Sequence, residues 1–273
     1  MLMISERSRA KTLVVAAAFL VSFTSLELVA LIPGYLEFFR GGPELWWWIE
    51  NAVRPLVPVV GGLLLLHGAR PRRWGAALGM DRPFLPALAL ATALCAPALF
   101  FPVALGVSPN LATGFADQLF GAGIWPLAEE INFRGFAFGQ IYSYSGLGFW
   151  PAALLTSALF GIGHMTNAAA AGLDLGGQLA NAGIVGASAL GLAWIYFRWG
   201  RNLWLVFFLH ALGNFAGSLY MSGEVAVGDR RFLTLLAVTL ILALGLTVLR
   251  DRFRWSKWVW ERVAGEQEGA IDA

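Results

Sequence analysis

Two adjacent carboxylates, Glu129 and Glu130, lie inside an apolar stretch of the sequence, and Arg134 follows four residues after the second. On a helix, Glu130 and Arg134 would share a face and could pair, whereas Glu129 would be rotated from Glu130 by about 100°. Glu130 could thus be held ionised while Glu129 projects toward a cavity. A carboxylate in a partly dehydrated cavity suits a general base that acts near neutral pH. An ion-pair network that only locks helices together stays open as an alternative.

Two of the three histidines also fall within apolar runs. His164 follows Gly161 and Gly163, and these glycines leave room for a neighbouring helix or a substrate backbone. His210 and Asn214 are four residues apart, so they would face one way on a helix. Two hydrogen-bond donors on one face can hold a developing oxyanion. Each of these polar side chains, taken alone, could equally bridge two helices by a hydrogen bond.

The composition indicates a polytopic membrane protein. Of the 273 residues, 58% are hydrophobic and only 13% are charged, whereas soluble domains carry about 25% charged residues. Ionisable side chains inside membrane spans are costly and are usually kept for function. The single cysteine, Cys95, excludes an internal disulfide and a cysteine-rich metal motif. No basic patch with interleaved aromatic residues supports binding of nucleic acid.

The elements that would carry these residues are membrane spans. A spanning helix needs about 20 mostly apolar residues, and eight segments qualify, over residues 11–32, 51–67, 84–106, 118–140, 149–171, 178–197, 203–221 and 232–249. We therefore expect an all-α, polytopic bundle of about eight transmembrane helices that forms a single domain over residues 1–273. Its motif core would span residues 118–221. The basic, tryptophan-rich residues 250–273 would form a cytoplasmic interfacial tail.

The basic residues give this bundle an orientation. With eight spans, those on one side are Arg7, Arg9, Lys11, Arg70, Arg72, Arg73, Arg82, Arg198, Arg201, Arg250, Arg252, Arg254, Lys257 and Arg262. The loops on the opposite side hold only Arg40, Arg230 and Arg231. The positive-inside rule therefore predicts that both termini are cytoplasmic.

The three polar groups follow one another in the patterns E-E-x-x-x-R, F-x-x-x-H and H-x-x-x-N, from Glu129 to Asn214. In this combination the sequence resembles the CAAX protease and bacteriocin-processing (CPBP) family, also called the Abi family. That family includes the type II CAAX prenyl endopeptidases, which are glutamate-dependent intramembrane proteases. The first three expected spans carry no signature of the family, so the resemblance there is one of topology only.

The resemblance implies that Glu129 is the catalytic glutamate and that it activates a water together with His164. It implies that His210 and Asn214 stabilise the oxyanion. A base, a positioned water and preorganised donors are what peptide hydrolysis requires.

By the same resemblance, Glu130 and Arg134 would be supporting residues that orient the site. The expected function is that of an intramembrane endopeptidase in the inner (plasma) membrane. Its partners would be the lipid bilayer and a membrane-associated protein or peptide substrate. Neither a metal nor an organic cofactor is expected.

Three other interpretations remain. Glu129, His164 and His210 are residue types that can bind zinc, but the H-E-x-x-H motif is absent. Ser188 has no histidine partner by spacing and no G-x-S-x-G motif for a serine protease. A non-catalytic scaffold, immunity protein or transporter of the same fold would also use intramembrane ionisable residues.

Outside these motifs, Glu27 falls in the first expected span and Arg54 in the second. Opposite charges inside an apolar bundle tend to pair with one another. We therefore expect Glu27 and Arg54 to form a structural ion pair.

Overall fold

The computed structural model is helical in every regular element of the part that it describes, as the sequence predicted. That part comprises residues 6–104, 106, 108–109, 114–220 and 230–253. The N-terminal helices are α1 (Glu6–Phe23), α2 (Ser25–Ala30), α3 (Tyr35–Gly41), α4 (Glu44–Val53), α5 (Leu56–His67), α6 (Pro71–Leu78) and α7 (Phe84–Ala104). A central segment follows with α8 (Phe115–Leu119), η1 (Phe120–Ile124), α9 (Trp125–Glu130), η2 (Ile131–Phe138) and α10 (Gly139–Tyr144). The remaining helices are α11 (Phe149–Gly163), α12 (Met165–Ala170), α13 (Leu175–Arg198), α14 (Leu203–Tyr220) and α15 (Arg230–Phe253).

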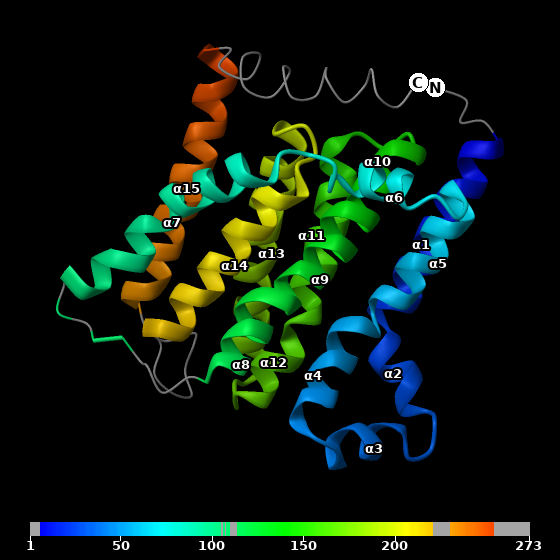
Figure 1. The fold of residues 1–273 in the computed structure, drawn as a ribbon, viewed down its shortest axis with the longest axis horizontal. Coiled ribbons are helices and arrows are strands. Elements are labelled where there is room, and N and C mark those ends of the chain that lie inside the picture. The colour runs from blue at the N-terminus through cyan, green and yellow to red at the C-terminus, as the bar shows by residue number, and fades with distance from the viewer. Residues whose placement is uncertain (1–5, 105, 107, 110–113, 221–229, 254–273) are drawn as a thin grey trace.

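The helices pack into one bundle, and most of their axes run between the same two ends (Figure 1). Helix α11 lies against α13, α14 lies against α7, and α1 lies against α5. The central segment from α8 to α10 contacts α1, α11 and α14. Side chains on this segment can therefore meet groups from several neighbouring helices.

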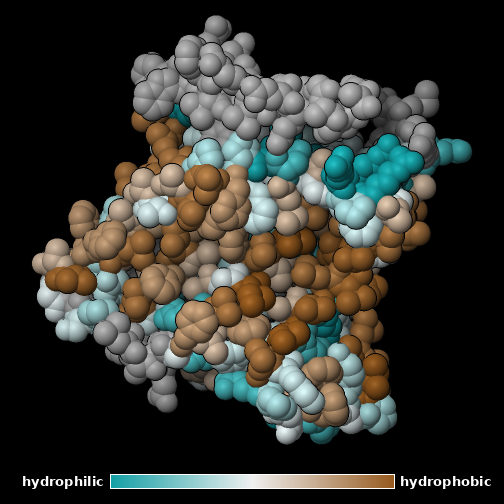
Figure 2. Space-filling model, in the orientation of Figure 1, coloured by the Kyte–Doolittle hydropathy of each residue, from teal (hydrophilic) through white to brown (hydrophobic). Residues whose placement is uncertain are grey.

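Four of the described helical stretches are long and apolar enough to cross a membrane: Glu44–His67, Phe84–Ala104, Leu175–Arg198 and Leu203–Tyr220. Hydrophobic residues dominate the middle of the face shown in Figure 2, and hydrophilic ones gather toward its two ends. These features support a multi-pass membrane protein. The count of eight spans and the cytoplasmic termini stay predictions, and most of the predicted interfacial tail, from residue 254 onward, lies outside the described residues.

Three of the expected spans are interrupted. The first breaks at Thr24, the second at Arg54–Pro55 and the fifth at His164. Proline has no amide hydrogen to donate, which accounts for the second break. At His164, the backbone amide bonds the carbonyl of Gly161, and the ring nitrogen Nδ1 lies 2.8 Å from the carbonyl oxygen of Phe160. Residues at or beside all three breaks line the same cavity, as expected for irregular backbone at membrane depth.

The central segment that carries the acidic pair is an irregular helix. The π-helical segments η1 and η2 stand on either side of α9, which ends with Glu129 and Glu130. π-helical turns are rare and occur frequently at functional sites. The predicted contact between Glu130 and Arg134, four residues apart, is nevertheless present.

A close helix contact holds the end of α11 in place. A methyl group at Gly161 would overlap the carbonyl oxygen of Ala182 on α13 and would lie 3.1 Å from the amide nitrogen of Gly186. Gly161 therefore admits a neighbouring helix, which is one of the two roles that the sequence indicated for it. The contact fixes the segment that presents His164.

Candidate active site

Glu130 is the buried centre of a charged network. Its Oε1 accepts a hydrogen bond from Nη1 of Arg134 at 2.8 Å and lies 2.8 Å from Nδ1 of His210, which α14 contributes. The side chains of Arg134 and Glu130 are 2% and 0% exposed. The Arg134 guanidinium also lies 4.6 Å from the ring centroid of Phe160. Both partners contact Oε1 of Glu130, and its Oε2 is buried without a hydrogen-bond partner among the described residues. Removal of either Arg134 or Glu130 would leave a buried charge unpaired, which is strongly destabilising.

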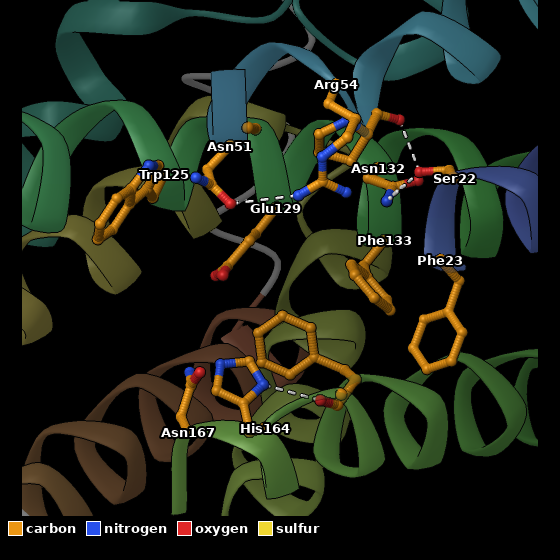
Figure 3. A pocket seen from close by; sticks show the side chains of 14 residues that line it. Ser22, Phe23, Asn51, Arg54, Trp125, Glu129, Asn132, Phe133, His164 and Asn167 are labelled. Carbon is orange, nitrogen blue, oxygen red and sulfur yellow. Dashed lines mark hydrogen bonds between the residues drawn. The ribbon is translucent and has the colours of Figure 1, made fainter. Parts of the chain in front are cut away.

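Glu129 has a different environment, although it is the adjacent residue. Its side chain is 34% exposed, and its Oε2 lies 3.7 Å from Nε2 of His210. It lines a cavity of about 340 Å³, and Figure 3 shows its side chain directed into this space toward His164. The two glutamates are thus divided as the sequence predicted, with Glu130 in a buried ion pair and Glu129 facing a cavity.

His164 faces Glu129 from the opposite wall of the cavity (Figure 3). Its Nδ1 lies 2.8 Å from the Phe160 carbonyl oxygen. A carbonyl oxygen only accepts hydrogen bonds, so Nδ1 carries the proton, and the neutral ring has its free lone pair on Nε2. The space between the carboxylate of Glu129 and this imidazole can hold a water molecule.

The hydrogen bond at Nδ1 of His210 determines what its other nitrogen can do. An ionised Glu130 can only accept, so Nδ1 donates to it. The Nε2 atom of the neutral ring, which lies on the side of Glu129, is then an acceptor. It becomes a donor only when the ring is protonated.

Glu129 and Glu130 carry two negative charges when ionised, against the single positive charge of Arg134. A protonated His210 would balance the charge of this cluster.

Asn214 lies at the edge of this arrangement. Its amide donates to the carbonyl oxygen of Gly121 on η1 at 3.3 Å, and Asn214 is exposed and is not among the residues that line the Glu129 cavity. Helix α14 packs on both η1 and α9, so His210 and Asn214 contact the same central segment. The pairing of these two side chains around an oxyanion stays a prediction.

The cavity also has a polar wall that the motifs did not indicate. Asn132 donates to Oγ of Ser22 at 2.8 Å, and Ser22 in turn donates to the carbonyl of Pro55 at 2.6 Å. Asn132 stands three residues after Glu129, so helical spacing offered one signal for its position. Ser22 carried no such signal, because its role depends on how α1 packs against the break between α4 and α5.

Arg54 contributes to the same wall, and its partner corrects the sequence prediction. Its Nε donates to Glu50 at 2.6 Å, and its two other nitrogens donate to Ser25 and Asn51. Arg54 thus pairs with Glu50 and not with Glu27, which is exposed on α2. Glu50 stands four residues before Arg54, which caps the C-terminal end of α4, and this spacing favours the local pair.

The structure also shows where the residues of the zinc and serine-protease interpretations lie, together with the single cysteine. No three His, Cys, Asp or Glu side chains of the described residues form a group that could hold a metal ion. Ser188 lies on α13 and is not among the residues that line the cavity. Cys95 is buried and 0% exposed.

Comparison with known proteins adds one finding. A family model described as type II CAAX prenyl endopeptidase Rce1-like matches residues 111–216. The match includes all three motifs, from Glu129 to Asn214, and it confirms the resemblance drawn from them. No curated protein and no solved structure matches the chain.

Proposed function

We infer that this chain, which through residues 111–216 belongs to the CAAX protease and bacteriocin-processing family, is a glutamate-dependent intramembrane endopeptidase. It would hydrolyse a peptide bond of a membrane-associated protein or peptide with a water molecule activated by Glu129 and His164. The inner (plasma) membrane is the proposed location. The reaction requires no metal or organic cofactor in this proposal.

The observation that carries the proposal is the placement of Glu129. Its partly exposed carboxylate points into a cavity of about 340 Å³ opposite His164, while the neighbouring Glu130 is fully buried in an ion pair. A residue that served only to lock helices together would be expected to resemble Glu130. A cavity-facing carboxylate opposite an imidazole is the arrangement that a water-activating base needs.

In the proposed reaction, Glu129 takes a proton from water as the water oxygen attacks the carbonyl carbon of the substrate. The other hydrogen of this water donates a hydrogen bond to Nε2 of His164, which orients the water oxygen toward the carbonyl carbon. The negative charge that forms on the carbonyl oxygen is stabilised by Nε2–H of a protonated His210 and by the amide of Asn214, which must exchange its hydrogen bond to Gly121 for one to the substrate. The C–N bond then breaks, and Glu129 returns its proton to the leaving amine.

The test uses the purified full chain in detergent, mixed with solubilised membrane proteins, with new peptide termini identified by mass spectrometry. Glu129→Ala and His164→Ala should abolish cleavage, since loss of a general base costs about 10²- to 10⁴-fold in rate. Glu37→Ala, which removes an exposed glutamate of α3 outside the cavity, is the matched control. Normal turnover by either folded variant would refute the assignment.

The non-catalytic alternatives predict a different outcome of the same experiment. A scaffold or an immunity protein would release no peptide at any concentration. A transporter would release none either, but it would show flux in sealed vesicles that depends on Glu129.

A further inference from the structure

A group of basic side chains gathers at the end of the bundle where α5 ends and α6 begins (Figure 1). There α1 contacts both α5 and α10, and α6 contacts the same two helices. Three cations lie within electrostatic range of the imidazole of His67, the last residue of α5, and they are Lys11 of α1, Arg73 of α6 and Arg201 of the α13–α14 turn. Lys11 also lies over the ring of Tyr144 on α10, 4.5 Å from its centroid. We call the three cations together with His67 the basic cluster.

The basic cluster has no acidic partner among the residues that the structure describes. In that part of the chain, no carboxylate lies within ion-pair distance of Lys11, Arg73 or Arg201. The side chains of Lys11 and Arg73 also donate no hydrogen bond to any described residue. Like charges that are held close together repel one another. A bound anion would remove this repulsion and would find donors that are still free on Lys11 and Arg73.

Hydrogen bonds to the end of α6 hold the cluster in place. The carbonyl oxygen of Ala77 accepts hydrogen bonds from Nη2 of Arg201 at 2.7 Å and from Nε2 of Gln140 at 2.8 Å. The carbonyl oxygen of Leu78 accepts one from the hydroxyl of Tyr196 at 3.0 Å. These bonds satisfy carbonyl groups that the last turn of a helix leaves without a partner. They fix α6 on the bundle, so a ligand would meet a backbone that is already arranged.

The cluster also lies where an apolar helix surface ends. His67 is the final residue of Glu44–His67, one of the helical stretches that are long and apolar enough to cross a membrane. Leu64 and Leu65, just before it, and Leu13 on the neighbouring α1 are exposed. Figure 2 shows hydrophilic residues toward this end of the molecule and hydrophobic ones next to them. In a membrane these leucines would face acyl chains, and the basic cluster would lie at the level of the lipid headgroups.

We propose that the basic cluster binds the phosphate group of an anionic phospholipid, whose acyl chains lie against the exposed leucines of α1 and α5. Ammonium and guanidinium groups bind phosphate oxygens through charge-assisted hydrogen bonds, and a guanidinium can bind two oxygens at once. A phosphate ion from solution would use the cations alone. The exposed leucines add an apolar surface that fits a lipid and has no use for an ion. This binding site is separate from the cavity at Glu129 and does not depend on the proposed protease function.

The test uses the purified full chain in detergent, titrated with phosphatidylglycerol, with the bound lipids counted by native mass spectrometry. Phosphatidylcholine with the same acyl chains carries no net charge and serves as the lipid control. Arg73→Gln removes one exposed cation of the cluster. Arg40→Gln is the matched control variant, because it removes an exposed arginine of α3, at the opposite end of the bundle (Figure 1).

We expect phosphatidylglycerol to bind more tightly than phosphatidylcholine. Arg73→Gln should weaken its tightest site by about fivefold, the effect of one basic residue near a membrane surface, and Arg40→Gln should leave that site unchanged. Equal binding of the two lipids, or equal effects of the two substitutions, would overturn the proposal. So would displacement of the lipid by an equimolar amount of inorganic phosphate, which would identify the cluster as a site for a free ion. The assay requires no hydrolysis, so its result is independent of the protease assignment.

Discussion

The adjacent glutamates offer a sharp comparison, because the same isosteric substitution should have opposite consequences at the two positions. Glu130→Gln removes the charge that balances Arg134 in a site where both side chains are at most 2% exposed. Glu129→Gln removes a charge from a side chain that is 34% exposed. The two variants differ by one position in the chain and leave the side-chain volume almost unchanged.

The expected magnitudes follow from burial. Breaking a buried ion pair from one side costs about 3 to 5 kcal/mol, since the remaining charge is left unpaired. At roughly 2 to 4 °C per kcal/mol for a chain of this size, Glu130→Gln should lower the melting temperature by about 6 to 20 °C. When its ring is protonated, His210 is the ion-pair partner of Glu129, at 3.7 Å, and partly exposed pairs contribute at most about 1 kcal/mol. Glu129→Gln should therefore lose activity while its melting temperature changes by no more than about 4 °C.

The assay is thermal unfolding of the purified protein in detergent with a dye that fluoresces on reaction with thiols. Cys95 suits this measurement because it is the sole cysteine and becomes reactive only when the bundle opens. Equal destabilisation by the two substitutions would refute the division of roles. So would a Glu130→Gln variant that melts like the natural chain.

Two other predictions test the packing and the chemistry. Gly161→Ala should destabilise the bundle by about 1 to 3 kcal/mol through overpacking and should reduce cleavage by displacing His164. Gly183→Ala on α13 is the matched control, because a methyl group there meets no atom within 4 Å; equal melting temperatures for the two variants would contradict the close contact of α11 and α13. Cleavage should persist in the presence of strong chelators, since the proposed base is a carboxylate acting directly on water. Loss of activity that zinc restores would instead favour the zinc interpretation.

Much of the site could be predicted because its signals are local. The four-residue spacing of Glu130 and Arg134 predicted a pair that the structure contains at 2.8 Å. The same helical periodicity predicted that Glu129 lies on a different face of the helix from this pair. The apolar composition predicted a helical membrane protein, because only hydrogen-bonded helices or closed barrels satisfy their backbone in lipid.

The helix interruptions and the polar wall could not be predicted in the same way. The hydrogen bond from Asn132 to Ser22 joins residues 110 positions apart, and nothing in the local spacing indicates it. The expected pair of Glu27 and Arg54 was wrong because Glu50, four residues before Arg54 in the chain, reaches the guanidinium at 2.6 Å. Which residue a buried charge pairs with depends on how the helices pack. The types and positions of the charged residues in the sequence do not give this packing.

By itself, the sequence determined the residue types for a water-activating site, the helical class and the charge asymmetry of the chain, because these depend on composition and short-range periodicity. Only the tertiary structure decided that Glu129 and His164 face one cavity and that His210 closes the network around Glu130. It also decided that Asn214 is not among the residues that line the cavity. These properties depend on how separate helices cross and where they break, and that is set by side-chain packing between residues distant in the chain.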